Sequence, residues 1–230
     1  DGKVNFITKL GKDRNAAMAI DLYKKSGVNI DGVMQDVNLS TGVAAIMIDE
    51  NGHNAINIVS GAAGLLDKED INKNLKIIKK SKIFLTQLET PQATTMYALK
   101  KAKEGGCITI LNPAPASPIN KEDYLLLDFF TPNETETEFY LNKKIKSNQD
   151  IKDAGNEFLD KGVKNIIITL GSKGVYFANS SESYFIEALK LKSDVVDTTG
   201  AGDAFNGALS VALSKDYSYK DALVFANKVG

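Results

Sequence analysis

A glycine-rich stretch beside a carboxylate is the part of this sequence with the clearest potential for chemistry. The turn Gly200-Ala201-Gly202 follows an apolar pair, Val195-Val196, and leads through Asp203 into the apolar segment Ala204 to Leu213. We interpret this order as a strand end, a tight turn and a buried helix. The first N–H groups of a helix have no partner inside the helix, and the helix dipole adds partial positive charge there. Because glycines let an anion approach the backbone closely, this turn predicts an anion site.

Asp203 carries a charge that would repel a resident anion. The carboxylate makes sense if the anion is a phosphoryl group in transit and Asp203 accepts the proton of the hydroxyl group that receives it. Phosphoryl transfer asks mainly for positioning and charge neutralisation, so a modest base suffices. From the residues alone a plainer interpretation stays open, in which Asp203 only favours the helix dipole.

Composition limits the class of protein. The 230 residues have a formal net charge of −1, and 43% are hydrophobic and 25% charged, which is ordinary for a globular chain of this size. The near-zero charge and the lack of long basic runs argue against a nucleic-acid partner. No apolar run has the length to cross a membrane, and no signal peptide is visible. The single cysteine, Cys107, excludes an internal disulfide, and we expect a buried thiol in a cytoplasmic protein.

The rest of the chain alternates apolar strand patterns with helical patterns. Such alternation indicates an α/β fold with a mostly parallel sheet covered by helices on both faces. One β-rich segment differs, because two strand patterns at about residues 38–60 flank Glu50-Asn-Gly52, which is typical of a hairpin. The only histidine, His53, falls at the predicted tip, and one histidine cannot make a metal site. We expect one domain over residues 1–230 that is truncated at both ends.

Ligands of parallel sheets bind at the carboxyl ends of the strands, so the residues after each strand matter most. Glu89 follows the strand pattern of residues 82–88, where it could cap the next helix or accept hydrogen bonds from sugar hydroxyls. Asn133 and Glu136 have the spacing of a helix capping box, which is the first interpretation of that pair. The loop at residues 169–174 joins two strands, and it matches neither a Walker loop nor a dinucleotide fingerprint.

These motifs together resemble those of the ribokinase-like (PfkB-type) carbohydrate kinases. The seven residues Asp197-Thr-Thr-Gly-Ala-Gly-Asp203 are similar to the C-terminal signature of that family. Four further motifs agree with its ribokinase branch: Gln87-Leu-Glu-Thr-Pro91, Asn112-Pro-Ala-Pro-Ala116, Thr131-Pro-Asn-Glu-Thr-Glu136 and Ile168-Thr-Leu-Gly-Ser-Lys-Gly174. The matching motifs run from about Gly42 to Asn227, so the resemblance implies the ribokinase-like fold for nearly the whole chain.

The resemblance also implies an activity, which is ATP-dependent phosphorylation of a sugar, with D-ribose and ribose 5-phosphate as the expected substrate and product. The implied catalytic residues are the base Asp203 and an anion hole at Gly200, Ala201 and Gly202. Glu89 and Asp203 would bind the sugar. The implied ATP-binding residues are Asn133, Thr169, Leu170, Gly171, Ser172, Lys173, Gly174, Gly202 and Asn227.

Two metal ions and a subunit contact follow from the same resemblance. Mg²⁺ would accompany ATP near Glu136, mostly through water, which suits a metal that keeps its waters and takes few protein ligands. K⁺ would bind near Asp197 and Thr199 as an activator. The hairpin would form half of a lid over the sugar and pair two subunits, so we expect a homodimer.

Three departures leave the sugar open. The family's N-terminal Asn-x-Asp strand with its Gly-Gly-Lys-Gly-Asn loop is missing, and so is its C-terminal segment. Gly61-Ala-Ala63 has alanine where ribokinases usually carry asparagine. A kinase of fructose, of a deoxy-sugar or of a nucleoside therefore remains an alternative, and so does a non-catalytic relative that binds a sugar or a nucleotide.

Overall fold

The computed structural model describes residues 2–48, 54–189 and 198–230. The chain divides into two compact units, which we describe separately. The first unit consists of Asp1–Lys80 with Glu89–Ala98, and the second of Ser81–Leu88 with Leu99–Gly230. Four features of the sequence interpretation lie outside the described residues: the hairpin turn at 50–52, His53, the strand end at 195–196 and Asp197.

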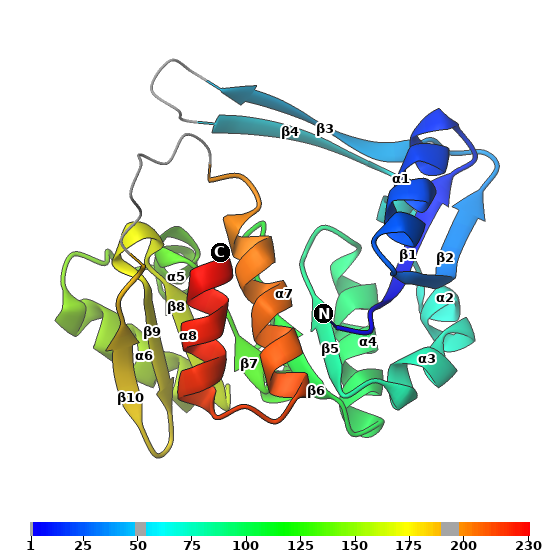
Figure 1. The fold of residues 1–230 in the computed structure, drawn as a ribbon. Helices are drawn as coiled ribbons and strands as arrows, with labels where there is room; N and C mark the ends of the chain where they lie inside the picture. The colour runs from blue at the N-terminus through cyan, green and yellow to red at the C-terminus, as the bar shows by residue number, and fades with distance from the viewer. Residues whose placement is uncertain (1, 49–53, 190–197) are drawn as a thin grey trace. The chain divides into compact units, whose positions relative to one another are not determined.

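The second unit is built on a six-stranded sheet with the order β10-β9-β8-β7-β6-β5 (Figure 1). Neighbours from β5 to β8 pair in parallel, and β9 and β10 are added antiparallel. The strands are β5 (Ile83–Thr86), β6 (Ile108–Leu111), β7 (Phe129–Phe130), β8 (Asn165–Thr169), β9 (Val175–Asn179) and β10 (Ser183–Ile186). The predicted mostly parallel α/β sheet is confirmed.

Helices cover both faces of this sheet because its central strands are apolar on both sides (Figure 1). Ile167 and Phe177 face α7 (Ala201–Ser214) and α8 (Tyr219–Val229) in one core cluster. Their neighbours Ile166 and Tyr176 face the other way and lie against Gly155 of α6 (Asn148–Asp160). Burying each large apolar side chain stabilises the fold by about 1.5–3 kcal/mol.

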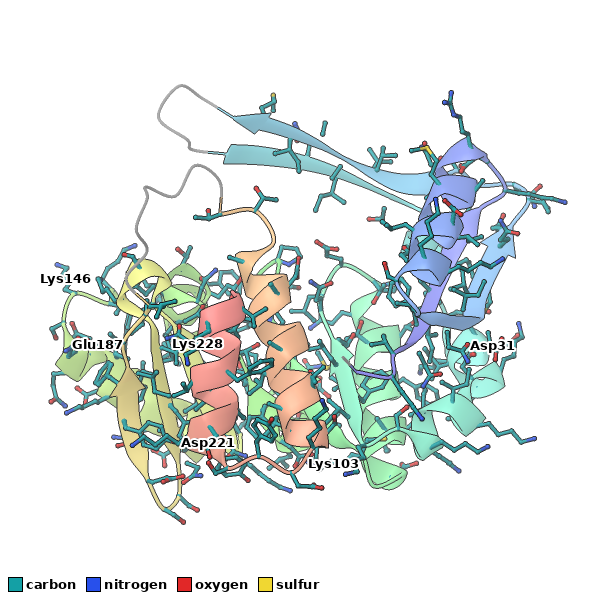
Figure 2. All side chains as sticks on the ribbon, viewed as in Figure 1. Asp31, Lys103, Lys146, Glu187, Asp221 and Lys228 are labelled. Atoms are coloured by element: carbon teal, nitrogen blue, oxygen red, sulfur yellow. The ribbon has the colours of Figure 1, made fainter. Side chains whose placement is uncertain are left out.

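The remaining helices of the second unit are shorter or lie at its border. They are η2 (Lys121–Leu126), α5 (Glu134–Leu141), η3 (Gly171–Lys173) and α4 (Gln92–Glu104), whose first half belongs to the first unit. In α8, Asp221 lies in the first turn and Lys228 in the last, so both charges complement the helix dipole (Figure 2). The Cys107 thiol is buried as expected, and burial raises its pKa.

The first unit begins with a parallel βαβ segment. It consists of β1 (Asn5–Gly11), α1 (Arg14–Lys25) and β2 (Asn29–Asp36). The expected hairpin follows, with β3 (Thr41–Ile48) and β4 (Asn54–Gly61) paired antiparallel from Thr41 opposite Gly61 to Ile48 opposite Asn54. The 3-10 turn η1 (Ala62–Leu65) then leads to α2 (Lys68–Lys73) and α3 (Leu75–Lys80).

An ion pair between the half-buried Lys9 and the buried Asp70 connects β1 to α2 within the first unit. The Lys9 Nζ lies 2.5 Å from the Asp70 carboxylate and donates a hydrogen bond to the Leu65 carbonyl at 3.0 Å. Burial alone would raise the Asp70 pKa, but hydrogen bonds from Lys9, the Asp67 backbone and Lys73 lower it below its ordinary value.

Two of the predicted helix boundaries are wrong. The spacing of Ile71, Leu75 and Ile78 predicts one helix over residues 68–79, but the chain forms two. The break lies at Asn74, whose Nδ2 donates to the Asp70 carbonyl at 2.9 Å while its backbone N–H donates to the Ile71 carbonyl. Helix α7 begins at Ala201 and not at Ala204, so Ala201, Gly202 and Asp203 form its first turn. Within the described part of the chain, no helix combines the length and the hydropathy needed to cross a membrane.

Candidate functional site

The start of α7 is an open helix N-terminus. Gly200 is its N-cap residue in the left-handed conformation, with φ of 83°, and among the described residues no side chain caps this end. The Ala201 N–H donates to the Thr198 carbonyl at 3.1 Å, so it is engaged in the turn itself. The N–H groups of Gly202 and Asp203 lie in the first turn, where the helix offers no carbonyl. Apart from its chain neighbours and the backbone of its own helix, no described atom comes within 4 Å of the place where a Gly202 side chain would begin. The surface of this turn is therefore open at Gly202.

Asp203 projects from this first turn and is exposed. Its Oδ1 accepts a hydrogen bond of 2.9 Å from Nε2 of Gln87, which follows strand β5. The site thus combines an accessible carboxylate with open N–H donors in one turn. This arrangement can accept a proton from a hydroxyl group while the N–H groups bind negative charge.

A buried polar chain holds the backbone of that turn. Asn206 is 3% exposed, and its Nδ2 donates to the Gly202 carbonyl at 2.9 Å. Its Oδ1 accepts a hydrogen bond of 2.8 Å from the Thr131 hydroxyl, which lies just beyond β7 and is 2% exposed. The start of α7 is therefore tied to the end of β7 by groups that would be costly to leave unpaired.

Asn133 and Glu136 form the capping box that their spacing predicts. The Asn133 Oδ1 accepts from the Glu136 N–H at 2.7 Å, and the Glu136 Oε2 accepts from the Asn133 N–H at 2.8 Å. Glu136 is 9% exposed, and this burial raises the pKa of its carboxyl above the ordinary value, although the Asn133 N–H partly offsets the shift. A buried carboxylate of this kind would gain from a nearby cation.

The predicted nucleotide loop lies beside that capping box. Asn133 and Thr169 pair as an isolated parallel bridge, and the Thr169 N–H donates to the Pro132 carbonyl at 2.9 Å. The loop from Leu170 turns through η3 to Gly174, whose carbonyl accepts from the Leu170 N–H at 2.8 Å. Gly174 has φ of 98°, and a side chain there would collide with the Ile186 carbonyl.

Other predicted ATP-binding residues lie close to this loop in the second unit. Gly171 has φ of 54° and open space around its Cα, and Ser172 and Lys173 are exposed. Lys173 lies 3.3 Å from the Glu134 carboxylate. The Asn227 side chain of α8 donates to the Glu187 carbonyl at 2.8 Å, in the segment that packs against Gly174.

Three further residues complete the predicted set. Glu89 is exposed and belongs to the first unit. Thr199 is exposed in the turn before α7, and Asp197 lies outside the described residues. In the portion that the structure describes, no group of three or more His, Cys, Asp or Glu side chains could by itself hold a metal ion.

The chain belongs to the pfkB family of carbohydrate kinases, whose profile matches residues 2–230. Within that family it is similar to a ribokinase of Staphylococcus aureus, with 37% identity over 224 residues that cover 97% of this chain and 73% of the other. A deoxyribokinase of Salmonella typhi is 35% identical over 211 residues, which cover 91% of this chain and 68% of the relative. The solved structure of Arabidopsis thaliana ribokinase complexed with ribose and ATP has a TM-score of 0.88 and 30% identity, and the match covers 98% of this chain and 73% of that one.

Sequence reasoning assigned no role to Gln87 or to the pair Asn206 and Thr131. Gln87 stands at the carboxyl end of a strand, which is a signal that could have found it. Asn206 is a polar residue in an otherwise apolar part of α7, and buried amides of this kind require partners.

Proposed function

We propose that this protein phosphorylates D-ribose at its primary hydroxyl group with ATP and yields ribose 5-phosphate. The proposal is supported by membership of the carbohydrate kinase family and by the similarity to ribokinases over nearly the whole chain. The observation that carries it is the exposed Asp203 carboxylate on the open first turn of α7.

In this reaction Asp203 accepts the proton of the sugar hydroxyl as its oxygen forms a bond to the γ-phosphorus of ATP. The bond to the ADP oxygen breaks, and ADP leaves. The Gly202 and Asp203 N–H groups, placed by Gly200 and Ala201, stabilise charge on the transferred phosphoryl group. Glu89, exposed at the surface of the first unit, would accept hydrogen bonds from sugar hydroxyls.

The nucleotide would lie along the loop at residues 169–174 and the start of α5. Gly171 leaves the backbone of this loop accessible, and Asn133 lies beside Thr169. Asn227 lies on α8 and is bonded to the segment that packs on Gly174, which supports a place near the adenine.

Two cations complete the proposal. Glu136 would hold Mg²⁺ through water, next to Asn133, and this fits a single buried carboxylate whose pKa is raised and which would gain from a cation. Mg²⁺ supplies charge neutralisation on the phosphates when it is bound. The proposed K⁺ site near Asp197 and Thr199 is supported by the sequence motif alone.

The hairpin β3–β4 would act as a lid on the sugar and pair two copies of the chain. Both strands expose large apolar side chains in their described parts, with Val43, Met47 and Val59 on one face of the hairpin and Ile46 and Ile58 on the other. Surface patches of this kind mark protein contacts. We place the protein in the cytoplasm on the basis of its single, buried cysteine.

An assay of ADP release with ribose, 2-deoxyribose, fructose and a nucleoside tests the substrate. We expect ribose to have the highest kcat/KM. The similarity to a deoxyribokinase makes 2-deoxyribose the specific rival, and a preference for it would replace the proposed sugar. Binding of sugar or ATP without any ADP release would instead favour a non-catalytic role.

The variant Asp203→Asn tests the base. We expect turnover to fall by about 100- to 10,000-fold, the usual contribution of a general base, with unchanged thermal unfolding and ATP binding. Near-normal phosphorylation by this variant would refute the assignment. Glu89→Ala should raise the sugar KM and leave the ATP KM nearly unchanged, and an equal rise in both would contradict its role.

A further inference from the structure

We infer that Gln87 is a positioning residue that orients the Asp203 carboxylate for proton transfer. This inference rests on the proposed function, in which Asp203 is the base. It starts from the 2.9 Å hydrogen bond between Gln87 Nε2 and Asp203 Oδ1, which joins residues 116 positions apart in the sequence.

The backbone of Gln87 is held on both sides. Before it, the Thr86 carbonyl accepts from the Asn112 N–H at 3.0 Å. After it, the Leu88 N–H donates to the Ala114 carbonyl at 3.0 Å, and the Leu88 side chain is buried. The Gln87 side chain therefore reaches Asp203 from a rigid point at the end of β5.

Asp203 lacks such support on its own side. It is exposed in the first turn of a helix, where its side chain would otherwise rotate among several conformations. A donor fixed to Oδ1 restricts that rotation and leaves Oδ2 to accept the hydroxyl proton. Holding a reacting group in its productive geometry can change a rate by roughly 100-fold for a displacement of about 1 Å.

The chemistry of glutamine suits this task better than that of a charged residue. An ionised carboxylate only accepts hydrogen bonds, so the NH₂ group of Gln87 must face Asp203. The amide is neutral and adds orientation without placing a fixed positive charge beside the base. A lysine would pair with the carboxylate and compete for its charge.

The test compares Gln87→Met and Gln87→Glu with the wild type in the full-length protein. Methionine keeps the length of the side chain and removes the donor, so we expect kcat to fall roughly 10- to 100-fold while the KM values for ribose and ATP change less than about twofold. Glutamate keeps the shape but adds a like charge beside Asp203, and we expect a loss at least as large. The matched control is Gln149→Met, which removes an equivalent glutamine-to-aspartate bond on the surface of α6 at 2.8 Å and should leave kcat unchanged.

A double variant separates positioning from other roles. If Gln87 acts through Asp203, Gln87→Met should have almost no further effect in the Asp203→Asn background, measured by single turnover with excess enzyme. A full loss in that background, or a raised ribose KM, would mean that Gln87 acts on the sugar itself and would overturn the inference. A lowered unfolding midpoint, together with a fall in kcat and a similar rise in both KM values, would show a merely structural role. An inactive wild type would instead refute the proposed function and is distinguishable from all of these results.

Discussion

Helices α5 and α7 of the second unit begin in opposite ways. At α5 the Asn133 and Glu136 side chains close the helix end through two reciprocal hydrogen bonds of 2.7 and 2.8 Å. At α7 the N-cap is Gly200, no described side chain caps the helix, and the first-turn carboxylate of Asp203 is bonded to Gln87 from another element. The start of α5 bonds its N–H groups with its own side chains, whereas the start of α7 keeps N–H groups that an anion could bind.

The difference shows that a helix start can either bond its own N–H groups, which adds stability, or keep them available for a ligand. A side-chain cap stabilises its helix by about 1 kcal/mol relative to alanine, whereas the glycine N-cap of α7 gives up only a few tenths of a kcal/mol and keeps donors for a ligand. The α7 turn is nevertheless well held, because Asn206 and Thr131 fix its backbone from within the core. The open end is thus rigid without being closed.

Among the variants that test this contrast between the two helix starts, Gly202→Ala should have the largest effect. A methyl group would enter the open space beside the first-turn N–H groups, so we expect kcat/KM to fall by roughly 100-fold, as when one anion-hole donor is lost. The free energy of unfolding should not fall, since alanine favours a helix over glycine. Gly207→Ala is the control, because that glycine also lies in α7 and, outside its chain neighbours and its own helix backbone, no described atom lies within 4 Å of an added Cβ. Equal kinetics of the two variants would remove the distinction between the open turn and the rest of α7.

Asn206→Leu should have the next largest effect. It removes the amide that bonds the Gly202 carbonyl and leaves the Thr131 hydroxyl with only its longer bond of 3.4 Å to the Leu111 carbonyl, and we expect a loss of about 1–3 kcal/mol in the free energy of unfolding in urea. Activity should fall as well, because the turn loses its inner support. Ser210→Ala, one turn along α7, serves for comparison and should cost clearly less. If the two variants are equally stable, the buried chain does not hold the turn.

Asn133→Ala should cost about 1 kcal/mol of stability, because a helix N-cap is lost. The comparison variant is Ser147→Ala, which removes the same type of capping box at the start of α6. Thermal unfolding should respond similarly in both. Only Asn133→Ala should raise the ATP KM, and a similar rise in Ser147→Ala would show that the nucleotide site merely reports overall stability.

The smallest effect on stability is expected for Glu136→Gln, and it depends on pH. Burial raises the Glu136 pKa, because the ionised carboxyl is disfavoured in the folded state. The protonated carboxyl therefore contributes to the stability of the folded state at low pH, and this contribution is lost as pH rises through the raised pKa. Glutamine caps equally well without a charge. The variant should therefore match the wild type at acid pH and become relatively more stable as pH rises, while its activity in low Mg²⁺ falls. A variant that is less stable at alkaline pH would contradict this sign, and unfolding in urea across pH values measures it.

Pattern and structure agree at most places where the controlling interactions are local. The alternation of apolar strands and helices predicted the mostly parallel sheet, and the Asn133 to Glu136 spacing predicted the capping box that is observed. The hairpin strands were also expected from their sequence. The exceptions were local competitions, in which Asn74 takes a helix carbonyl and α7 starts within the glycine turn.

The amino-acid sequence by itself determined the family, the sheet and the presence of an uncapped glycine turn followed by a carboxylate, because composition and short-range spacing carry that information. Only the tertiary structure decided what holds this turn. The partners Gln87 and Thr131 lie 116 and 75 residues away from Asp203 and Asn206, respectively. Hydrogen bonds of that kind form only after the sheet has brought its strand ends together, so no local sequence pattern could predict them.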